Sequence, residues 1–261
     1  MELAMSTKLF DLTGKVALVS GGSSGLGFQF AKALAGQGAD IALVARRTGR
    51  LEENKAAIEN MGVRCYTHFV DFLDYPSIGK CVEDVVAHYG KVDILMNAAG
   101  VRGVGSGSEQ SNEEWLRVID ADLNGQYFMT RDVAKLAMIP RNYGKVINVL
   151  SIHAYVGRIG LATGSYCAAK GGMLTLTKAL GNEWAKHNIT VNGIAPGYFP
   201  SDITARYIDS EAFRQTLETY CPFGRPGRTG EMDGIAIYFA SDASSYTTGQ
   251  VVSVDGGWLT V

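Results

Sequence analysis

Short apolar runs that alternate with longer helical patterns constrain the fold of this chain more than any other feature. The first three runs lie at Lys15–Ser20, Asp40–Ala45 and Val63–Val70, and helical patterns at Leu26–Gly36 and Arg50–Met61 separate them. Strands joined by helices of this length run parallel. The alternation continues with helices expected at Ser77–Tyr89, Glu113–Met138, Ser165–His187 and Gly230–Ala240, and strands at Val92–Asn97, Lys145–Leu150, Ile189–Ala195 and Gln250–Val254. The sequence therefore predicts an α/β fold, a doubly wound parallel sheet of about seven strands with helices on both faces.

The length and composition of the chain suit a single large α/β domain. It has 261 residues, 46% of them hydrophobic, and no linker, low-complexity tract or internal repeat interrupts it. We therefore expect one catalytic domain over residues 1–261. The longest irregular region, about residues 196–229, is rich in aromatic side chains and is expected to form a lid over the substrate. These aromatics are Tyr198, Phe199, Tyr207, Phe213, Tyr220 and Phe223.

Charge and cysteine usage exclude several classes of protein. The net charge is −2 and the one tight basic cluster is Arg46, Arg47 and Arg50, which argues against a nucleic-acid partner. No apolar run approaches the ~18–20 residues that span a bilayer, and Met1–Phe10 lacks the apolar core of a secretory signal. The cysteines are scattered without a C-x-x-C motif, and the histidines lack metal-ligand spacing. We expect a cytoplasmic protein with free thiols and no metal or membrane partner.

A glycine-rich turn directly follows the first expected strand. It reads GGSSGLG over residues 21–27 and leads into a helical pattern. Its glycines permit a tight turn and a close approach of the backbone, while the helix N-terminus offers free N–H groups to a pyrophosphate. The turn predicts a Rossmann-type dinucleotide site that uses Gly21, Ser23, Ser24, Gly25, Leu26 and Gly27.

Tyr166 and Lys170 stand four residues apart at the start of an expected helix and so share one face. A free tyrosine has a pKa near ~10, and a nearby cation favours its phenolate form. Lowering that pKa by two to three units takes about 3–4 kcal/mol, which one unit charge at ~4 Å in an effective dielectric near ~20 supplies. The pair predicts an acid/base catalyst, although the spacing alone also occurs on solvated helices.

The motifs and their order resemble the short-chain dehydrogenase/reductase superfamily over nearly the whole chain. The glycine motif of that family is matched with Ser20 in place of the usual threonine. The other matching motifs, in chain order, are Asn97-Ala98-Ala99-Gly100, Asn124, Ser151, Tyr166 with Lys170, Pro196-Gly197 and Asp255-Gly256-Gly257. The resemblance implies an NAD(P)(H)-dependent oxidoreductase that interconverts a secondary alcohol and a ketone by hydride transfer.

The resemblance also assigns catalytic roles to four residues. Tyr166 exchanges the proton, Lys170 lowers the pKa of Tyr166 and binds the nicotinamide ribose, and Asn124 helps to order a water beside the lysine. Ser151 directly follows its strand, as the family serine does. It lies fifteen residues before Tyr166, however, whereas about thirteen is usual in the family, and the residue thirteen before Tyr166 is His153. We prefer Ser151, because a loop absorbs two extra residues at little cost.

The end of the second expected strand indicates the cofactor. An acid there commonly binds the ribose 2′-OH of NAD, whereas this chain has Arg46 and Arg47, which favours NADP and leaves NAD possible. Ser23 and Ser24 occupy the loop positions where some NADP-preferring relatives carry a second basic residue. By resemblance, the remaining cofactor contacts are Asp71 and Phe72 at the adenine, Asn97, Ala98 and Gly100 at its ribose, Lys170 and Tyr166 at the nicotinamide ribose, and Pro196, Gly197, Phe199 and Ser201 at the nicotinamide end.

The substrate is the least constrained part of the prediction. The turn at 21–28, the segment 195–202 and Asp255–Trp258 resemble gluconate 5-dehydrogenase-like members, so Arg102, Arg158 or His153 could meet a sugar-acid carboxylate. A 3-oxoacyl-carrier-protein reductase and a hydroxysteroid dehydrogenase use the same machinery and remain alternatives. A non-catalytic nucleotide-sensing protein is a remote alternative from another class. The resemblance further implies a homotetramer.

Overall fold

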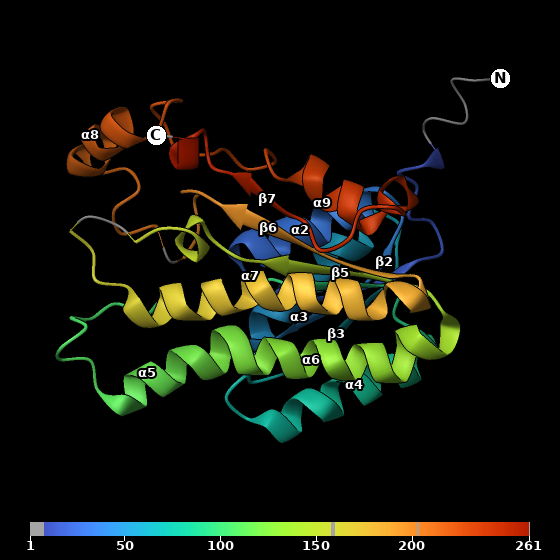
Figure 1. Ribbon diagram of the computed structural model, residues 1–261. Helices are drawn as coiled ribbons and strands as arrows, with labels where there is room; N and C mark the ends of the chain where they lie inside the picture. The colour runs from blue at the N-terminus through green and yellow to red at the C-terminus, as the bar shows by residue number, and fades with distance from the viewer. Residues whose placement is uncertain (1–7, 158–159, 203, 261) are drawn as a thin grey trace.

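Seven parallel strands form one central sheet in the computed structural model of the chain, which describes residues 8–157, 160–202 and 204–260 (Figure 1). The strand order is β3-β2-β1-β4-β5-β6-β7, and every neighbouring pair is parallel. The strands are β1 (Val16–Ser20), β2 (Asp40–Ala45), β3 (Cys65–Phe69), β4 (Ile94–Asn97), β5 (Gly144–Val149), β6 (Ile189–Pro196) and β7 (Val251–Val254). The chain order reverses between β1 and β4, where such sheets bind ligands beyond their carboxyl ends. The predicted doubly wound fold is confirmed.

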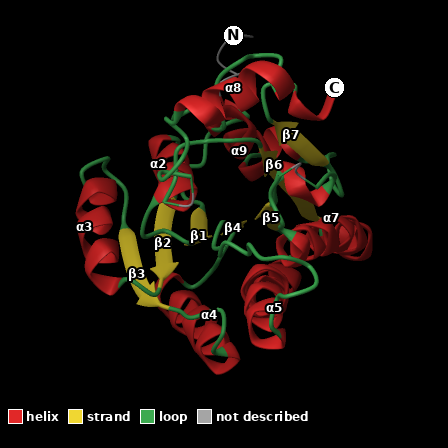
Figure 2. Cartoon of the chain, turned by 90° about the vertical axis from the view of Figure 1, so that its left-hand side faces the viewer, coloured by secondary structure: helices red, strands yellow, loops and turns green. Residues whose placement is uncertain are grey.

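Helices cover both faces of this sheet (Figure 2). One face packs against α2 (Gly25–Gly36), α3 (Thr48–Glu59) and α9 (Asp233–Ala240), and the other against α4 (Tyr75–Tyr89), α6 (Gly125–Val133) and α7 (Gly164–Trp184). Strand β1 serves both layers, since Ala17 and Val19 belong to one buried cluster while Leu18 belongs to the other. Burial on both faces explains the nearly continuous apolar strands of the sequence.

The long helix expected at Glu113–Met138 is interrupted by two π-helical turns. It begins as α5 (Asn112–Ile119), where Ser111 caps the N-terminus by accepting a hydrogen bond from the Glu114 N–H at 3.2 Å. A π-helical turn at Asp120–Asn124 then leads into α6, and a second one follows at Ala134–Met138. A π turn inserts an extra residue and so changes which side chains face the core.

The region expected to be irregular, 196–229, contains a helix that the sequence interpretation missed. Helix α8 (Glu211–Tyr220) is capped by Ser210, which accepts a hydrogen bond from the Phe213 N–H at 3.3 Å. Phe213 and Leu217 lie one turn apart and pack into a cluster with Tyr198. This cap and this apolar pair are the physical reason why the segment is helical there.

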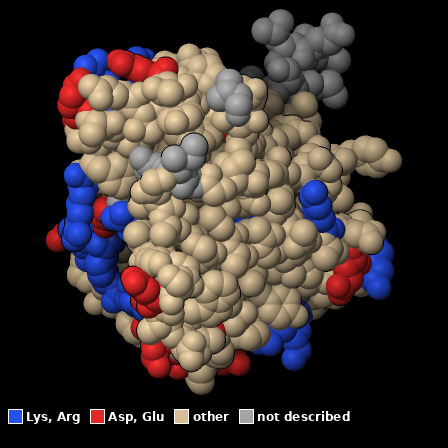
Figure 3. Space-filling model, turned by 60° about the vertical axis from the view of Figure 1, so that its left-hand side comes forward, with Lys and Arg blue, Asp and Glu red and all other residues tan. Residues whose placement is uncertain are grey.

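The helices, the cysteines and the charged surface bear on possible membrane, metal and nucleic-acid partners. Within the described ranges, no helix combines the length and the apolar character needed to cross a membrane. The four cysteines are free thiols, and the described residues hold no group of three or more His, Cys, Asp or Glu suited to a metal ion. On the face in Figure 3, basic and acidic side chains are interspersed at the margins of a largely uncharged surface.

Candidate active site

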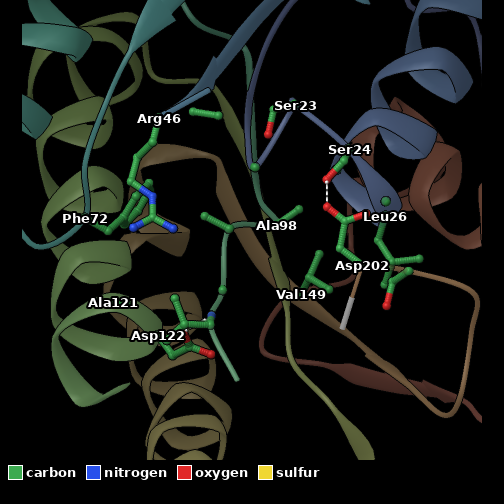
Figure 4. A pocket seen from close by; sticks show the side chains of 18 of the residues that line it. Ser23, Ser24, Leu26, Arg46, Phe72, Ala98, Ala121, Asp122, Val149 and Asp202 are labelled. Atoms are coloured by element: carbon green, nitrogen blue, oxygen red, sulfur yellow. Dashed lines mark hydrogen bonds between the residues drawn. The ribbon is translucent and has the colours of Figure 1, made fainter. Parts of the chain in front are cut away.

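A cavity of about 260 Å³ lies where the carboxyl ends of β1, β2, β4 and β5 meet (Figure 4). The turns that leave these four strands supply most of its wall, as expected for a doubly wound sheet. Its lining includes most of the residues that the sequence assigned to a cofactor: Gly21, Ser23, Ser24, Gly25, Leu26, Gly27, Arg46, Arg47, Asp71, Phe72, Ala98, Gly100, Tyr166, Lys170 and Ser201.

The glycine-rich turn forms the floor of this cavity. Gly21 and Gly25 have φ values of 70° and 54°, which side chains rarely allow. A Cβ on Gly27 would lie 2.4 Å from the carbonyl oxygen of Gly21, so only glycine lets α2 start this close to β1. Helix α2 has no acidic residue in its first turn, and its first N–H groups have no partner within the helix. This positive helix end fits the pyrophosphate of a dinucleotide.

The two arginines after β2 have different surroundings. Arg47 donates to the Ser23 hydroxyl from Nε at 3.1 Å and from Nη2 at 3.0 Å, and its Nη1 pairs with Asp202 at 3.0 Å. Asp202 also accepts a hydrogen bond from Ser24 at 2.8 Å. Arg46 instead extends toward Phe72, with no hydrogen-bond or ion-pair partner in the described part of the chain (Figure 4). Asp202 closes the segment 195–202 that carried the family resemblance, but no local pattern indicates that it pairs with Arg47.

Four expected cofactor residues do not line this cavity. The Asn97 side chain is fully buried and donates to Thr130 Oγ1 at 2.7 Å and Asn148 Oδ1 at 2.9 Å, so it ties β4 to β5 and α6. Both hydrogen bonds of its Nδ2 are thus made inside the fold, and Asn97 is not among the residues that line the cavity, so its role as a ribose contact stays a prediction. Pro196, Gly197 and Phe199 line a second, neighbouring cavity instead.

This second cavity has a volume of about 120 Å³ and shares Leu26, Leu150, Tyr166 and Ser201 with the first. Tyr166 therefore stands between the two spaces. Ser151, the serine favoured by the strand-based assignment, lines the second cavity together with Tyr166.

Two other side chains proposed for the substrate also line this second cavity. The His153 ring centroid lies 6.1 Å from that of Tyr166, and its Nδ1 lies 3.1 Å from the Val156 carbonyl oxygen. The structure thus brings both alternatives, Ser151 and His153, to the same cavity. Arg102 is the one Lys, Arg, Asp or Glu residue in the described lining, whereas Arg158 lies outside the described residues.

Lys170 approaches Tyr166 from the next turn of α7. Its buried Nζ lies 5.6 Å from the Tyr166 ring centroid, donates to the Val149 carbonyl at 3.2 Å, and lies 3.3 Å from Asp122 Oδ2. Burial raises the pKa of Tyr166; Lys170 and a hydrogen bond from Ser151 oppose this rise, and Asp122 adds to it. The pKa of Tyr166 is thus above its usual value. The expected lowering by Lys170 is present but smaller than the cost of burying a phenolate.

Asn124 does not occupy the place beside the lysine that the sequence interpretation gave it. Its Nδ2 donates to Asp120 Oδ1 at 2.8 Å, and the Tyr75 hydroxyl donates to the same oxygen at 2.6 Å. The side chain that reaches Lys170 from this π-helical turn is Asp122, which is fully buried. Counting residues along a regular helix cannot identify it, because the π turn shifts the register of side chains.

Comparisons with known proteins agree with this geometry. The family model described as enoyl-(acyl carrier protein) reductase matches residues 21–259. The chain is 36% identical to gluconate 5-dehydrogenase of Gluconobacter oxydans, over 95% of this chain and 96% of that protein. It is 38% identical to 2-dehydro-3-deoxy-D-gluconate 5-dehydrogenase of Dickeya dadantii, over 98% and 99%. A crystal structure of a gluconate 5-dehydrogenase from Burkholderia cenocepacia in complex with NADP and tartrate superposes with a TM-score of 0.93 at 30% identity, over 98% and 99%.

The doubly wound sheet, the glycine turn and the cavity at the switch point define a Rossmann-type dinucleotide-binding protein. The extent of the matches makes the assignment more specific, because they span almost the entire chain and the relatives are named dehydrogenases and reductases. The chain belongs to the short-chain dehydrogenase/reductase family and is an oxidoreductase acting on CH–OH groups.

Proposed function

We propose that this chain is an NADP(H)-dependent enzyme that interconverts a secondary alcohol and a ketone on a small sugar acid. The observation that carries the proposal is the position of Tyr166 between a dinucleotide-shaped cavity and a smaller one. A group that exchanges a proton with substrate while hydride moves must border both the cofactor and the substrate. Tyr166 is the residue of the expected catalytic set that lines both cavities, since Ser151 lines the second alone and Lys170 the first alone.

The mechanism assigns one task to each side chain. A bound nicotinamide supplies or accepts the hydride. In reduction, Tyr166 donates its proton to the carbonyl oxygen of the substrate, while the Ser151 hydroxyl hydrogen-bonds that oxygen and positions it. The Lys170 ammonium stabilises the phenolate left behind, and in oxidation the same phenolate takes the proton of the alcohol. The raised pKa keeps Tyr166 protonated at neutral pH, the form that reduction needs.

The size and charge of the second cavity support a small anionic substrate. Its volume of about 120 Å³ is below the ~300–1,000 Å³ of pockets that take drug-sized ligands, which favours a sugar acid over a steroid. The Arg102 guanidinium lies 5.8 Å from the Tyr207 ring centroid at this cavity and offers a fork of donors to a carboxylate. The names of the relatives, which act on gluconate and a dehydro-deoxygluconate, point the same way.

The cofactor proposal rests on Arg46. It projects into the first cavity without a partner in the described chain, so it is available to a 2′-phosphate. The Burkholderia relative holds NADP. A homotetramer, a cytoplasmic location and a single catalytic domain with a lid at about 196–229 remain inferences from sequence and family resemblance; a monomeric mass in solution would contradict the first.

Two experiments test the proposal. A panel of keto-gluconates, an acetoacetyl thioester and a ketosteroid, each with NADPH and NADH, should give the fastest oxidation of NADPH with a keto-gluconate. If no panel member reacts, the substrate assignment fails, while measured dinucleotide binding still tests the cofactor site.

The second experiment removes the proton donor. Tyr166→Phe should lower kcat by about 10²–10⁴-fold, because a general acid contributes that much. Its affinity for NADPH, measured by fluorescence titration, should stay within about twofold. Tyr246→Phe is the matched control, since Tyr246 is fully exposed. Full turnover in Tyr166→Phe would remove Tyr166 from the mechanism.

A further inference from the structure

A buried carboxylate lies beside the proposed catalytic lysine. Asp122 is 0% exposed, and its Oδ1 accepts a hydrogen bond from the Val101 N–H at 2.7 Å. Its Oδ2 has no hydrogen-bond partner, and the Lys170 Nζ at 3.3 Å is its ion-pair contact. Gly100 leaves room for this oxygen, since a Cβ there would lie 3.2 Å from it. Because an unpaired buried carboxylate is costly, the ammonium is what makes this position tolerable.

The contact constrains Lys170 as well. The ammonium is held from two sides, by the Val149 carbonyl at 3.2 Å and by Asp122 at 3.3 Å, and its side chain is 4% exposed. Burial by itself would disfavour the ammonium, and the Asp122 carboxylate raises the pKa of Lys170 above its usual value. A lysine fixed in this way stays charged and in place near Tyr166.

We propose that Asp122 is the counter-ion of Lys170 and, as a positioning residue, fixes the ammonium and offsets part of its charge at Tyr166. The inference rests on the proposed roles of Tyr166 and Lys170. Its consequence is that Tyr166 retains its proton to a higher pH than it would beside a lysine with a neutral partner. The Lys170 Nζ lies 3.3 Å from Asp122 Oδ2 and 5.6 Å from the Tyr166 ring centroid, so the carboxylate oxygen is at most about 9 Å from that ring centroid. At an effective dielectric near ~20, a unit charge at ~9 Å shifts a neighbouring pKa by roughly one unit.

Asp122 is the acidic group in this environment; burial raises its pKa, while Lys170 and the hydrogen bond from the Val101 N–H oppose that rise and favour the carboxylate. Other polar and charged groups also surround Tyr166 and Asp122. They are Lys170 on α7, Ser151 and His153 in the loop after β5, Tyr207 in the 196–229 segment, Arg102 at the second cavity and Arg117 on α5. Arg117 is already paired with Glu114 at 2.7 Å. Replacing Asp122 by an amide therefore removes one charge and keeps an oxygen for the Val101 N–H.

The direct test is a titration of Tyr166 without cofactor or substrate. The ultraviolet absorbance of tyrosinate is followed against pH in the wild type and in Asp122→Asn, each compared with its own Tyr166→Phe counterpart to isolate one phenol. The expected result is a fall of about one unit in the pKa of Tyr166 in Asp122→Asn. Asp120→Asn is the control, because it makes the same chemical change two residues earlier, where the carboxylate accepts hydrogen bonds from Asn124 and Tyr75. It should leave the pKa of Tyr166 unchanged. An unshifted or raised pKa in Asp122→Asn would overturn the proposal.

The pH profile of kcat/KM separates this proposal from the proposed function. If both hold, the alkaline limb of ketone reduction moves to lower pH by about one unit in Asp122→Asn. If Tyr166→Phe abolishes turnover but the Asp122→Asn profile is unmoved, the counter-ion role alone fails. If Tyr166→Phe retains turnover, the proposed function fails, whereas the cofactor-free titration still decides the electrostatic role of Asp122.

A stability cycle keeps the pairing testable if Asp122→Asn is too unstable to titrate. Lys170→Met leaves the buried Asp122 carboxylate unpaired and should lower the melting temperature at pH 7. Adding Asp122→Asn to Lys170→Met should restore part of that loss, because the uncompensated charge is gone. A double variant no more stable than Lys170→Met would show that Asp122 and Lys170 are not a pair, and would overturn the proposal.

Discussion

Replacing Arg46 by alanine should weaken NADPH binding and leave NADH binding nearly unchanged. Arg46 follows β2 directly, is exposed, lines the dinucleotide cavity and has no partner within the described ranges. Arg47, by contrast, is tied to Ser23 and Asp202, so a 2′-phosphate would have to compete for it. Arg46 thus offers its charge without first breaking a contact.

The exposure of Arg46 sets the size of the effect. A charge-assisted hydrogen bond contributes about 1.5–3 kcal/mol when protected from water, and less at an exposed site where salt screens it. We therefore expect a loss of about 1–2 kcal/mol, which is roughly 5–30-fold in the Kd of NADPH. NADH lacks the phosphate, so its Kd should change less than about twofold.

Fluorescence titration of both reduced cofactors, at low and at moderate salt, measures this difference. Arg50→Ala is the matched control, because Arg50 lies one turn further along in α3 and does not line the cavity. The NADPH effect of Arg46→Ala should shrink as salt rises. If Arg46→Ala weakened NADPH binding and NADH binding equally, or if the wild type bound the two cofactors equally well, Arg46 would not recognise the 2′-phosphate.

Two further changes test other parts of the structure. Arg102→Gln should raise KM for a keto-gluconate about 5–30-fold with little change in kcat. An exposed charge that only binds the substrate carboxylate stabilises the ground state and the transition state equally. An unchanged KM would exclude Arg102 from carboxylate recognition. Asp93→Asn should lower stability at pH 7 by about 2 kcal/mol, because the buried carboxylate pairs with Arg141 at 2.7 Å and Lys91 at 3.1 Å. Burial opposes ionisation of Asp93, but hydrogen bonds from Arg141 and the Val16 N–H hold the pKa of Asp93 below its usual value. The stability that the Asp93 carboxylate contributes is therefore present above pH ~3.9 and is lost as the pH falls through the lowered pKa. Thermal melts should therefore show a steeper acid loss in the wild type than in Asp93→Asn, and parallel curves would contradict the role of Asp93.

The sequence predicted the sheet and the glycine-rich turn because both depend on local patterns. Strand periodicity and turn chemistry act over a few residues, so the strand at Asp40–Ala45 and the turn at 21–27 could be found without tertiary information. Asp122 could not, because the π turn at Asp120–Asn124 sets which side chain faces Lys170. The pairing of Arg47 with Asp202 joins residues far apart in the chain, and no local pattern signals it. Helix α8 is different, since the Ser210 cap and the spacing of Phe213 and Leu217 are local signals that the sequence itself carries.

The raised pKa of Tyr166 changes how the tyrosine–lysine pair is understood. A low-dielectric site strengthens the attraction between the Lys170 ammonium and a phenolate, but it also raises the cost of forming that phenolate. With Asp122 beside the lysine, the three groups together carry no net charge while Tyr166 is protonated, so the protonated phenol is the resting form. Such a site holds a proton ready for a ketone and releases it only as charge develops on the substrate oxygen. Ketone reduction should therefore proceed across neutral pH, and alcohol oxidation should become faster as the pH rises toward the raised pKa of Tyr166.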